Sequence, residues 1–126
     1  MQASAFLGLR TALYVTPDLA RAKAWYAELL DVTPYFDEPF YVGFNVGGFE
    51  LGLLPADDTH AAGPGGAVPY WGVERLDQAW TRVLAHGATA VEPPADVGGD
   101  IRVAVARDPF GNLIGLIENP HFPNTA

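Results

Sequence analysis

The segment from Arg107 to Ile117 constrains the fold of this chain more than any other. Its centre reads Asp108-Pro109-Phe110-Gly111-Asn112. Pro109 fixes φ for a tight turn, and Asp108 can accept hydrogen bonds from the backbone that follows it. Gly111 and Asn112 tolerate a positive φ. Apolar runs lie on both sides of this turn, so the segment predicts two antiparallel strands joined in a hairpin.

The order of elements repeats loosely along the chain. An apolar strand end at residues 13–15 is followed by a helical pattern over residues 17–31, and residues 70–73 are followed by one over 75–86. Three short strands are expected after each helix, at about 33–37, 40–46 and 49–54 and at about 89–92, 100–106 and 113–118. Each half is therefore expected to be a βαβββ module.

Local signals set the expected boundaries. Thr16 can cap the first helix, with Pro17 at its first position, and Gly87 sits where the second helix should end in a left-handed residue. Gly47-Gly48 predicts a two-residue hairpin, and Pro93-Pro94 predicts the start of a loop. The chain is expected to form one domain, with module one at about 7–55, a linker at about 56–66, module two at about 67–119 and a tail at 120–126.

Two motifs carry a family resemblance. The run Thr16-Pro17-Asp18-Leu19 with Trp25-Tyr26 after it, together with the hairpin around Gly111, resembles the glyoxalase/bleomycin-resistance/dioxygenase superfamily, the vicinal-oxygen-chelate proteins. The resemblance implies an α+β fold in which two βαβββ modules form a curved mixed sheet. Its concave face would hold a ligand. Family members are commonly dimers, so a homodimer is expected.

The resemblance also identifies four positions that bind metal in the family's enzymes. Here they are occupied by Arg10, Glu50, Val68 and Gly115. An arginine has no lone pair to donate, and valine and glycine offer no donor side chain. A stable site needs three or four protein ligands. A member without a metal or another cofactor is therefore expected.

Strand alternation predicts which side chains face the cavity. Polar groups, aromatic rings and small residues are expected to form an aromatic cup of the kind that binds small molecules. The candidate ligand-binding residues are Arg10, Tyr14, Tyr41, Asn45, Glu50, Val68, Tyr70, Arg102 and Gly115. Arg10 and Glu50 are expected to form an ion pair or to share a ligand, because neither charge should be buried alone.

Charge and composition exclude several function classes. The net charge is −8, and seven scattered Lys and Arg residues form no phosphate-binding surface, so a nucleic-acid partner is not expected. No apolar run is long enough for a membrane span, and the absence of cysteine excludes thiolate chemistry. A cytoplasmic location is the default expectation. His60, His86 and His121 show no metal-ligand spacing, although His121 lies in a tail that could fold over a pocket.

The sequence is compatible with three functions. The first is a metal-independent protein that binds or sequesters a drug or metabolite. The second is an enzyme of the superfamily, a glyoxalase-like lyase or isomerase or a dioxygenase, or a metal-free variant. In that variant the catalytic candidates are Glu50 as general base and Arg10 as oxyanion stabiliser. The third is a regulatory or accessory subunit, because a fold alone does not determine function.

Overall fold

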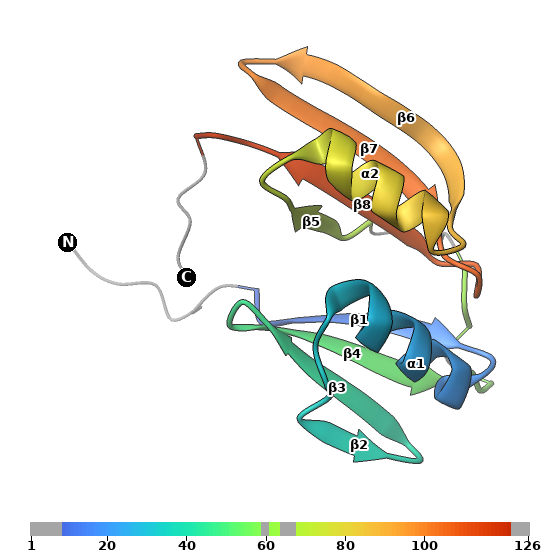
Figure 1. Cartoon of the computed structure of the whole chain (residues 1–126). Coiled ribbons are helices and arrows are strands. Elements are labelled where there is room, and N and C mark those ends of the chain that lie inside the picture. Colours follow the sequence, from blue (N-terminus) through green and yellow to red (C-terminus); the bar gives the residue numbers. More distant parts are fainter. Residues whose placement is uncertain (1–8, 59–60, 64–67, 122–126) are drawn as a thin grey trace.

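The computed structural model describes residues 9–58, 61–63 and 68–121 and contains two βαβββ modules (Figure 1). The elements of module one are β1 (Thr11–Thr16), α1 (Leu19–Leu30), β2 (Phe36–Glu38), β3 (Tyr41–Val46) and β4 (Phe49–Pro55). Those of module two are β5 (Tyr70–Gly72), α2 (Leu76–Ala85), β6 (Thr89–Gly98), β7 (Ile101–Arg107) and β8 (Leu113–Glu118). The α+β class and the doubled βαβββ order expected from the sequence are confirmed.

The two modules have the same topology. Each contributes a four-stranded mixed sheet, with strand orders β1-β4-β3-β2 and β5-β8-β7-β6. The pairs β1–β4 and β5–β8 are parallel, and the remaining pairs are antiparallel. The inner edges β1 and β5 face each other across the molecule (Figure 1). Within the described residues, neither helix is long and apolar enough to cross a membrane.

One hydrophobic core joins the modules. Tyr26 of α1 and Leu76 of α2 belong to the same buried cluster. The indole Nε1 of Trp71 on β5 donates a hydrogen bond of 3.2 Å to the hydroxyl of Tyr14 on β1. Because these side chains lie between the helices and the sheets, the two modules are packed as one unit.

The turn between β7 and β8 also links the modules. Asp108 is buried, and its Oδ1 accepts hydrogen bonds from the backbone N–H groups of Phe110 and Asn112 at 2.9 and 2.8 Å. Its Oδ2 accepts a hydrogen bond from the hydroxyl of Tyr26 on α1. The side-chain amide of Asn112 donates to the carbonyl of Val15 at 2.7 Å. The motif that predicts the hairpin therefore also fixes the position of module two on module one.

The start of α1 differs from the expectation. Asp18, not Thr16, is the N-cap residue, and its carboxylate accepts a hydrogen bond from the backbone N–H of Arg21. Thr16 is buried and its hydroxyl accepts from the N–H of Asp18 instead. Gly87 follows α2 with a positive φ of 110°, as predicted for the end of this helix. The predicted hairpin turn at Gly47-Gly48 is also present, with φ of 62° and 90°.

The strand β6 also differs from the expectation. The sequence predicts a loop from Pro93-Pro94, but β6 continues through both prolines to Gly98. It is the edge strand of its sheet and pairs only with β7, with register shifts on both sides of the prolines. An edge strand accepts proline because its outward N–H groups need no partner in the sheet.

Candidate functional site

Each sheet has one face that packs against a helix and one that does not. Leu51 and Leu53 of β4 are almost fully buried on the helix side. Gly52 lies between them and points to the opposite face, where a Cβ would come within 2.6 Å of Leu13 and close to the Tyr41 hydroxyl. We call this the open face of module one. It carries Leu13, Tyr41, Glu50 and Gly52.

Glu50 is the polar centre of the open face. The hydroxyl of Tyr35 donates a hydrogen bond to its Oε1, and the hydroxyl of Tyr41 donates one to its Oε2. Burial and the hydrogen bond to Glu50 raise the pKa of Tyr41, and the hydrogen bond to Glu50 is the main reason that the pKa of Tyr35 is raised. Both phenols therefore keep their protons and remain donors to the carboxylate.

A pocket of about 220 Å³ opens beside this carboxylate. It is lined by Arg10, Thr11, Tyr35, Asn45, Gly48, Phe49 and Glu50. The backbone carbonyl of Arg10 accepts a hydrogen bond of 2.8 Å from the N–H of Glu50, which places the two residues at the same end of the β1–β4 pair. Arg10, Asn45 and Glu50, all expected in the site, are thus brought together.

The expected ion pair between Arg10 and Glu50 does not form. Among the ion pairs of the described residues, none joins the two side chains, although both line the pocket. Arg10 is exposed, so its charge is hydrated, whereas Glu50 is half-buried and is hydrogen-bonded by the tyrosines. The carboxylate and the guanidinium are separate features of one pocket.

Tyr70 and Gly115 meet on the open face of module two. They are paired across β5 and β8, and a Cβ at Gly115 would lie 2.7 Å from Cδ2 of the Tyr70 ring. Val68 lies two residues before β5 and is half-buried. These three residues come after the pocket residues in the sequence, and none of them lines the pocket.

Two expected cavity residues point the other way. Tyr14 is 4% exposed and packs against Tyr26 of α1, with ring centroids 5.6 Å apart. Arg102 of β7 forms an ion pair of 3.1 Å with Asp77 of α2. Both belong to the helix side of their sheets, so their predicted orientation is wrong. In β1 and β7 apolar side chains occupy both faces, and alternation does not indicate which face turns inward.

Sequence reasoning missed Tyr35, Thr11 and Phe49. Tyr35 comes from the loop before β2, and its ring covers Gly43, where a Cβ would lie 3.2 Å from Cε1. Residues in loops follow no alternation, so no periodic signal could have placed Tyr35 beside Glu50. Thr11 is paired with Glu50 in the β1–β4 register, which the sequence alone does not give.

The histidines lie away from this pocket. The Nε2 of His121 is 2.8 Å from the carbonyl of Gly99, at the turn between β6 and β7. The Nε2 of His86 is 3.0 Å from the carbonyl of Trp25. His60 lies outside the described residues.

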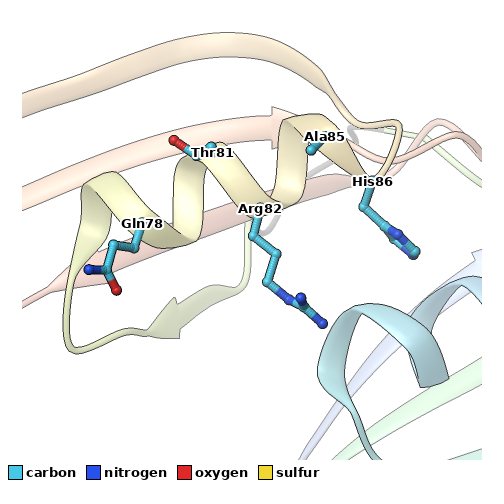
Figure 2. A pocket seen from close by; sticks show the side chains of 5 residues that line it. All are labelled: Gln78, Thr81, Arg82, Ala85 and His86. Atoms are coloured by element: carbon cyan, nitrogen blue, oxygen red, sulfur yellow. The ribbon is translucent and has the colours of Figure 1, made fainter.

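A second hollow, of about 370 Å³, lies along α2 and is lined by Gln78, Thr81, Arg82, Ala85 and His86 (Figure 2). Arg82 and His86 point from α2 toward α1 (Figure 2). The guanidinium of Arg82 donates to the carbonyls of Glu28 and Leu29 at 2.9–3.0 Å, at the last turn of α1. The charged groups of this hollow are thus used in packing the two helices.

A sequence model described as the Glyoxalase/Bleomycin resistance protein/Dioxygenase superfamily matches residues 8–116. The chain belongs to this superfamily. The resemblance inferred from the two sequence motifs is thereby confirmed. No protein with a curated description matches the chain.

Solved structures with the superfamily fold are similar over nearly the whole chain. A glyoxalase-related enzyme from Fulvimarina pelagi is 20% identical, with a TM-score of 0.78 over 96% of this chain and 94% of that one. A glyoxalase/bleomycin resistance protein/dioxygenase family enzyme from Burkholderia phytofirmans PsJN is 18% identical, with a TM-score of 0.73 over 86% and 95%. TioX from Micromonospora sp. ML1 is 18% identical, with a TM-score of 0.68 over 89% and 98%. At these identities the likeness shows the fold alone.

The residues at the four positions that the sequence resemblance assigns to a metal do not fit a metal ion. Glu50 offers the only carboxylate among the four, and both of its oxygens already accept hydrogen bonds from phenols. Gly115 has no side chain, and the Tyr70 ring covers it. In the described part of the chain, no group of three His, Asp or Glu side chains is placed to hold a metal ion.

Proposed function

We propose that this chain is a metal-independent small-molecule-binding protein of the glyoxalase/bleomycin-resistance type. The observation that carries the proposal is the pocket beside Glu50, in which a phenol-bound carboxylate, a separate arginine and exposed aromatic rings surround about 220 Å³. Such a combination of apolar walls and a few polar groups is typical of ligand sites. Arg10, Tyr35, Tyr41, Asn45 and Glu50 are the proposed ligand-binding residues.

Binding without turnover is favoured over catalysis by the state of Glu50. A general base needs a free lone pair aimed at the proton that it removes. Both oxygens of Glu50 are hydrogen-bonded by tyrosines whose raised pKa values keep them protonated. Each oxygen keeps a second lone pair that can accept a hydrogen bond from a ligand, but a full proton transferred to Glu50 would weaken the hydrogen bonds from both tyrosines. The proposal therefore assigns no catalytic residue.

A homodimer is part of the same proposal. Leu13, Tyr35 and Tyr70 on the open faces are each about half-exposed or more, and Phe49 at the pocket is 55% exposed. Apolar surface of this kind is typical of an interface or a ligand site. Light scattering at micromolar concentration should give about twice the mass of 13.5 kDa. A monomer mass at that concentration would contradict the dimer. The cytoplasmic location stays a prediction.

The test of the proposed function combines two measurements on the purified protein. Mass spectrometry after denaturing extraction should detect a small molecule that copurifies with the wild type and is depleted from Glu50→Gln. Elemental analysis should find no stoichiometric Zn, Ni, Fe or Mn. A near-stoichiometric metal whose removal by a chelator abolishes an activity would overturn the proposal.

A further inference from the structure

We infer that the pocket beside Glu50 selects ligands that carry a protonated amine. The inference rests on the proposed function and names the ligand class of the same site. It follows from the hydrogen-bonding capacity of Tyr35, Glu50 and Tyr41. The similar proteins assign no ligand class to this pocket.

The three polar groups can only accept further hydrogen bonds. A phenol has one O–H donor, and both phenols direct it at Glu50. What remains on each phenol oxygen is its lone pairs, and the ionised carboxylate is also acceptor-only. Because the pKa of each tyrosine is raised, this arrangement holds across the physiological pH range. A ligand group that meets this cluster must therefore donate hydrogen bonds.

Charge selects among the possible donors. Glu50 is half-buried, so its negative charge is screened less than that of an exposed carboxylate. Arg10 also lines the pocket, but it is exposed and lies beyond ion-pair distance of Glu50, so water screens its charge. The net charge of −8 also attracts cations from a distance. An ammonium group donates hydrogen bonds to the acceptor oxygens and carries a charge opposite to that of Glu50. A hydroxyl group donates a hydrogen bond but carries no charge.

The rings around the pocket support the same ligand class. Tyr35 is 63% exposed and Phe49 is 55% exposed, and both line the pocket. Exposed ring faces attract ammonium groups through their quadrupoles and also cover the apolar part of a ligand. A small amphipathic amine fits these walls better than a carboxylate of the same shape, which Glu50 would repel.

Three probes of matched shape test the inference: phenethylamine, 2-phenylethanol and 3-phenylpropionate. Each is titrated into the wild-type protein at low salt, and the shifts of backbone amide signals at Gly48 and Glu50 are followed by NMR. The amine should bind at least about tenfold more tightly than the alcohol or the acid, the ratio expected for a hydrogen bond to a charged group. Glu50→Gln should abolish this preference, because it removes the charge and keeps the size.

Glu92→Gln is the matched control, since Glu92 is an exposed carboxylate on the edge strand β6 and does not line the pocket. It should leave the preference for the amine unchanged. Equal or tighter binding of the alcohol or the acid would overturn the inference and leave the proposed function standing. If no probe moves the pocket amides at millimolar concentration, the amine inference is overturned, and the copurification experiment decides the proposed function separately. A preference that survives in Glu50→Gln would also overturn it.

Discussion

The ring of Tyr70 lies directly over Gly115, so closely that the glycine has room for no side chain. A Cβ there would lie 2.7 Å from Cδ2 of the ring and 2.9 Å from the carbonyl oxygen of Pro69. The resemblance to the superfamily assigns this position to a metal-binding residue of its metal enzymes, usually a glutamate. In this chain the Tyr70 ring fills the space above Gly115, so a larger side chain at this position would displace the ring.

We predict that Gly115→Ala destabilises the protein by about 1–3 kcal/mol, the usual cost of inserting a methyl group into filled space. The ring of Tyr70 can turn aside, but the Pro69 carbonyl belongs to the backbone and can move less. Urea unfolding of the two proteins measures the difference. Gly72→Ala on the neighbouring strand is the control, because no atom lies within 4 Å of a Cβ at that position. Equal stability of both variants would contradict the prediction.

The hydrogen bond between Tyr26 and Asp108 gives a second prediction. Tyr26 is 1% exposed, and its hydroxyl donates to Oδ2 of the buried carboxylate at 2.5 Å. Tyr26→Phe should cost about 1.5–3 kcal/mol of unfolding free energy, because the buried carboxylate loses one of its three hydrogen-bond donors. In Tyr70→Phe the lost hydroxyl belongs to a ring that is 46% exposed, and the change should stay within about 0.5 kcal/mol. Chemical denaturation that ranks the two variants in the opposite order would refute this account of the hairpin motif.

Tyr14 gives a prediction for alkaline pH. Burial raises its pKa to about 12, with the hydrogen bond from Trp71 acting in the opposite direction, against an ordinary value of 10.0. Between pH 10 and pH 12 the unfolded chain releases this proton and the folded chain keeps it. The stability that is fully present below pH 10 is therefore lost as the pH rises through that window.

Two pKa units correspond to roughly 2–3 kcal/mol. Tyr14→Phe should be less stable than the wild type at pH 7, because Trp71 loses its hydrogen-bond partner. Its stability should nevertheless fall less steeply between pH 10 and pH 12. Unfolding free energies measured at intervals of half a pH unit test this, and parallel curves for the two proteins would contradict it.

The sequence was sufficient for the fold because its signals agree at several levels. The turn around Gly111, the helix patterns and the hairpin at Gly47-Gly48 each fix a local geometry, and together they repeat one order of elements. Pro93 and Pro94 led to the wrong prediction of a loop. Proline is excluded only from a central strand, and nothing in the sequence marks β6 as an edge strand.

The site residues were harder to predict, because a residue lines the site only if it lies on the correct face of its strand. In β1, Leu13 and Tyr14 are both apolar enough for a core. The resemblance placed Tyr14 in the cavity, but Tyr14 is buried on the helix side and Leu13 lies on the open face. In β7, Ala104 and Ala106 lie on the helix side with Arg102, but Val103 and Val105 make the other face apolar as well, so alternation does not identify the helix side. No sequence signal places Tyr35, because a loop brings it to Glu50.

The guanidinium of Arg82 gives a fourth prediction. It donates to two carbonyls at the end of α1, where no residue of that helix can satisfy them. Arg82→Ala should lower the unfolding free energy by about 1–3 kcal/mol. Arg107 is exposed, and its side chain takes part in none of the hydrogen bonds or ion pairs of the described residues, so Arg107→Ala should change the unfolding free energy by less than about 0.5 kcal/mol. Equal effects would contradict a capping role for Arg82.

The carboxylates of Asp108 and Glu50, each hydrogen-bonded on both oxygens, should respond very differently to removal. Asp108 is 3% exposed and accepts hydrogen bonds from the Tyr26 hydroxyl and from two backbone N–H groups. Asp108→Ala leaves these buried donors without a partner and should cost about 3 kcal/mol or more. Glu50 lies on the open face, and its partners Tyr35 and Tyr41 can reach water once it is gone.

Glu50→Ala should therefore change the unfolding free energy by less than about 1 kcal/mol, since no buried ion pair with Arg10 is broken. Thermal and urea unfolding of both variants measure the contrast. A loss of several kcal/mol in Glu50→Ala would mean that the carboxylate holds the fold together. In that case the hydrogen bonds from the two tyrosines would be structural, and the pocket would lose its main support as a ligand site.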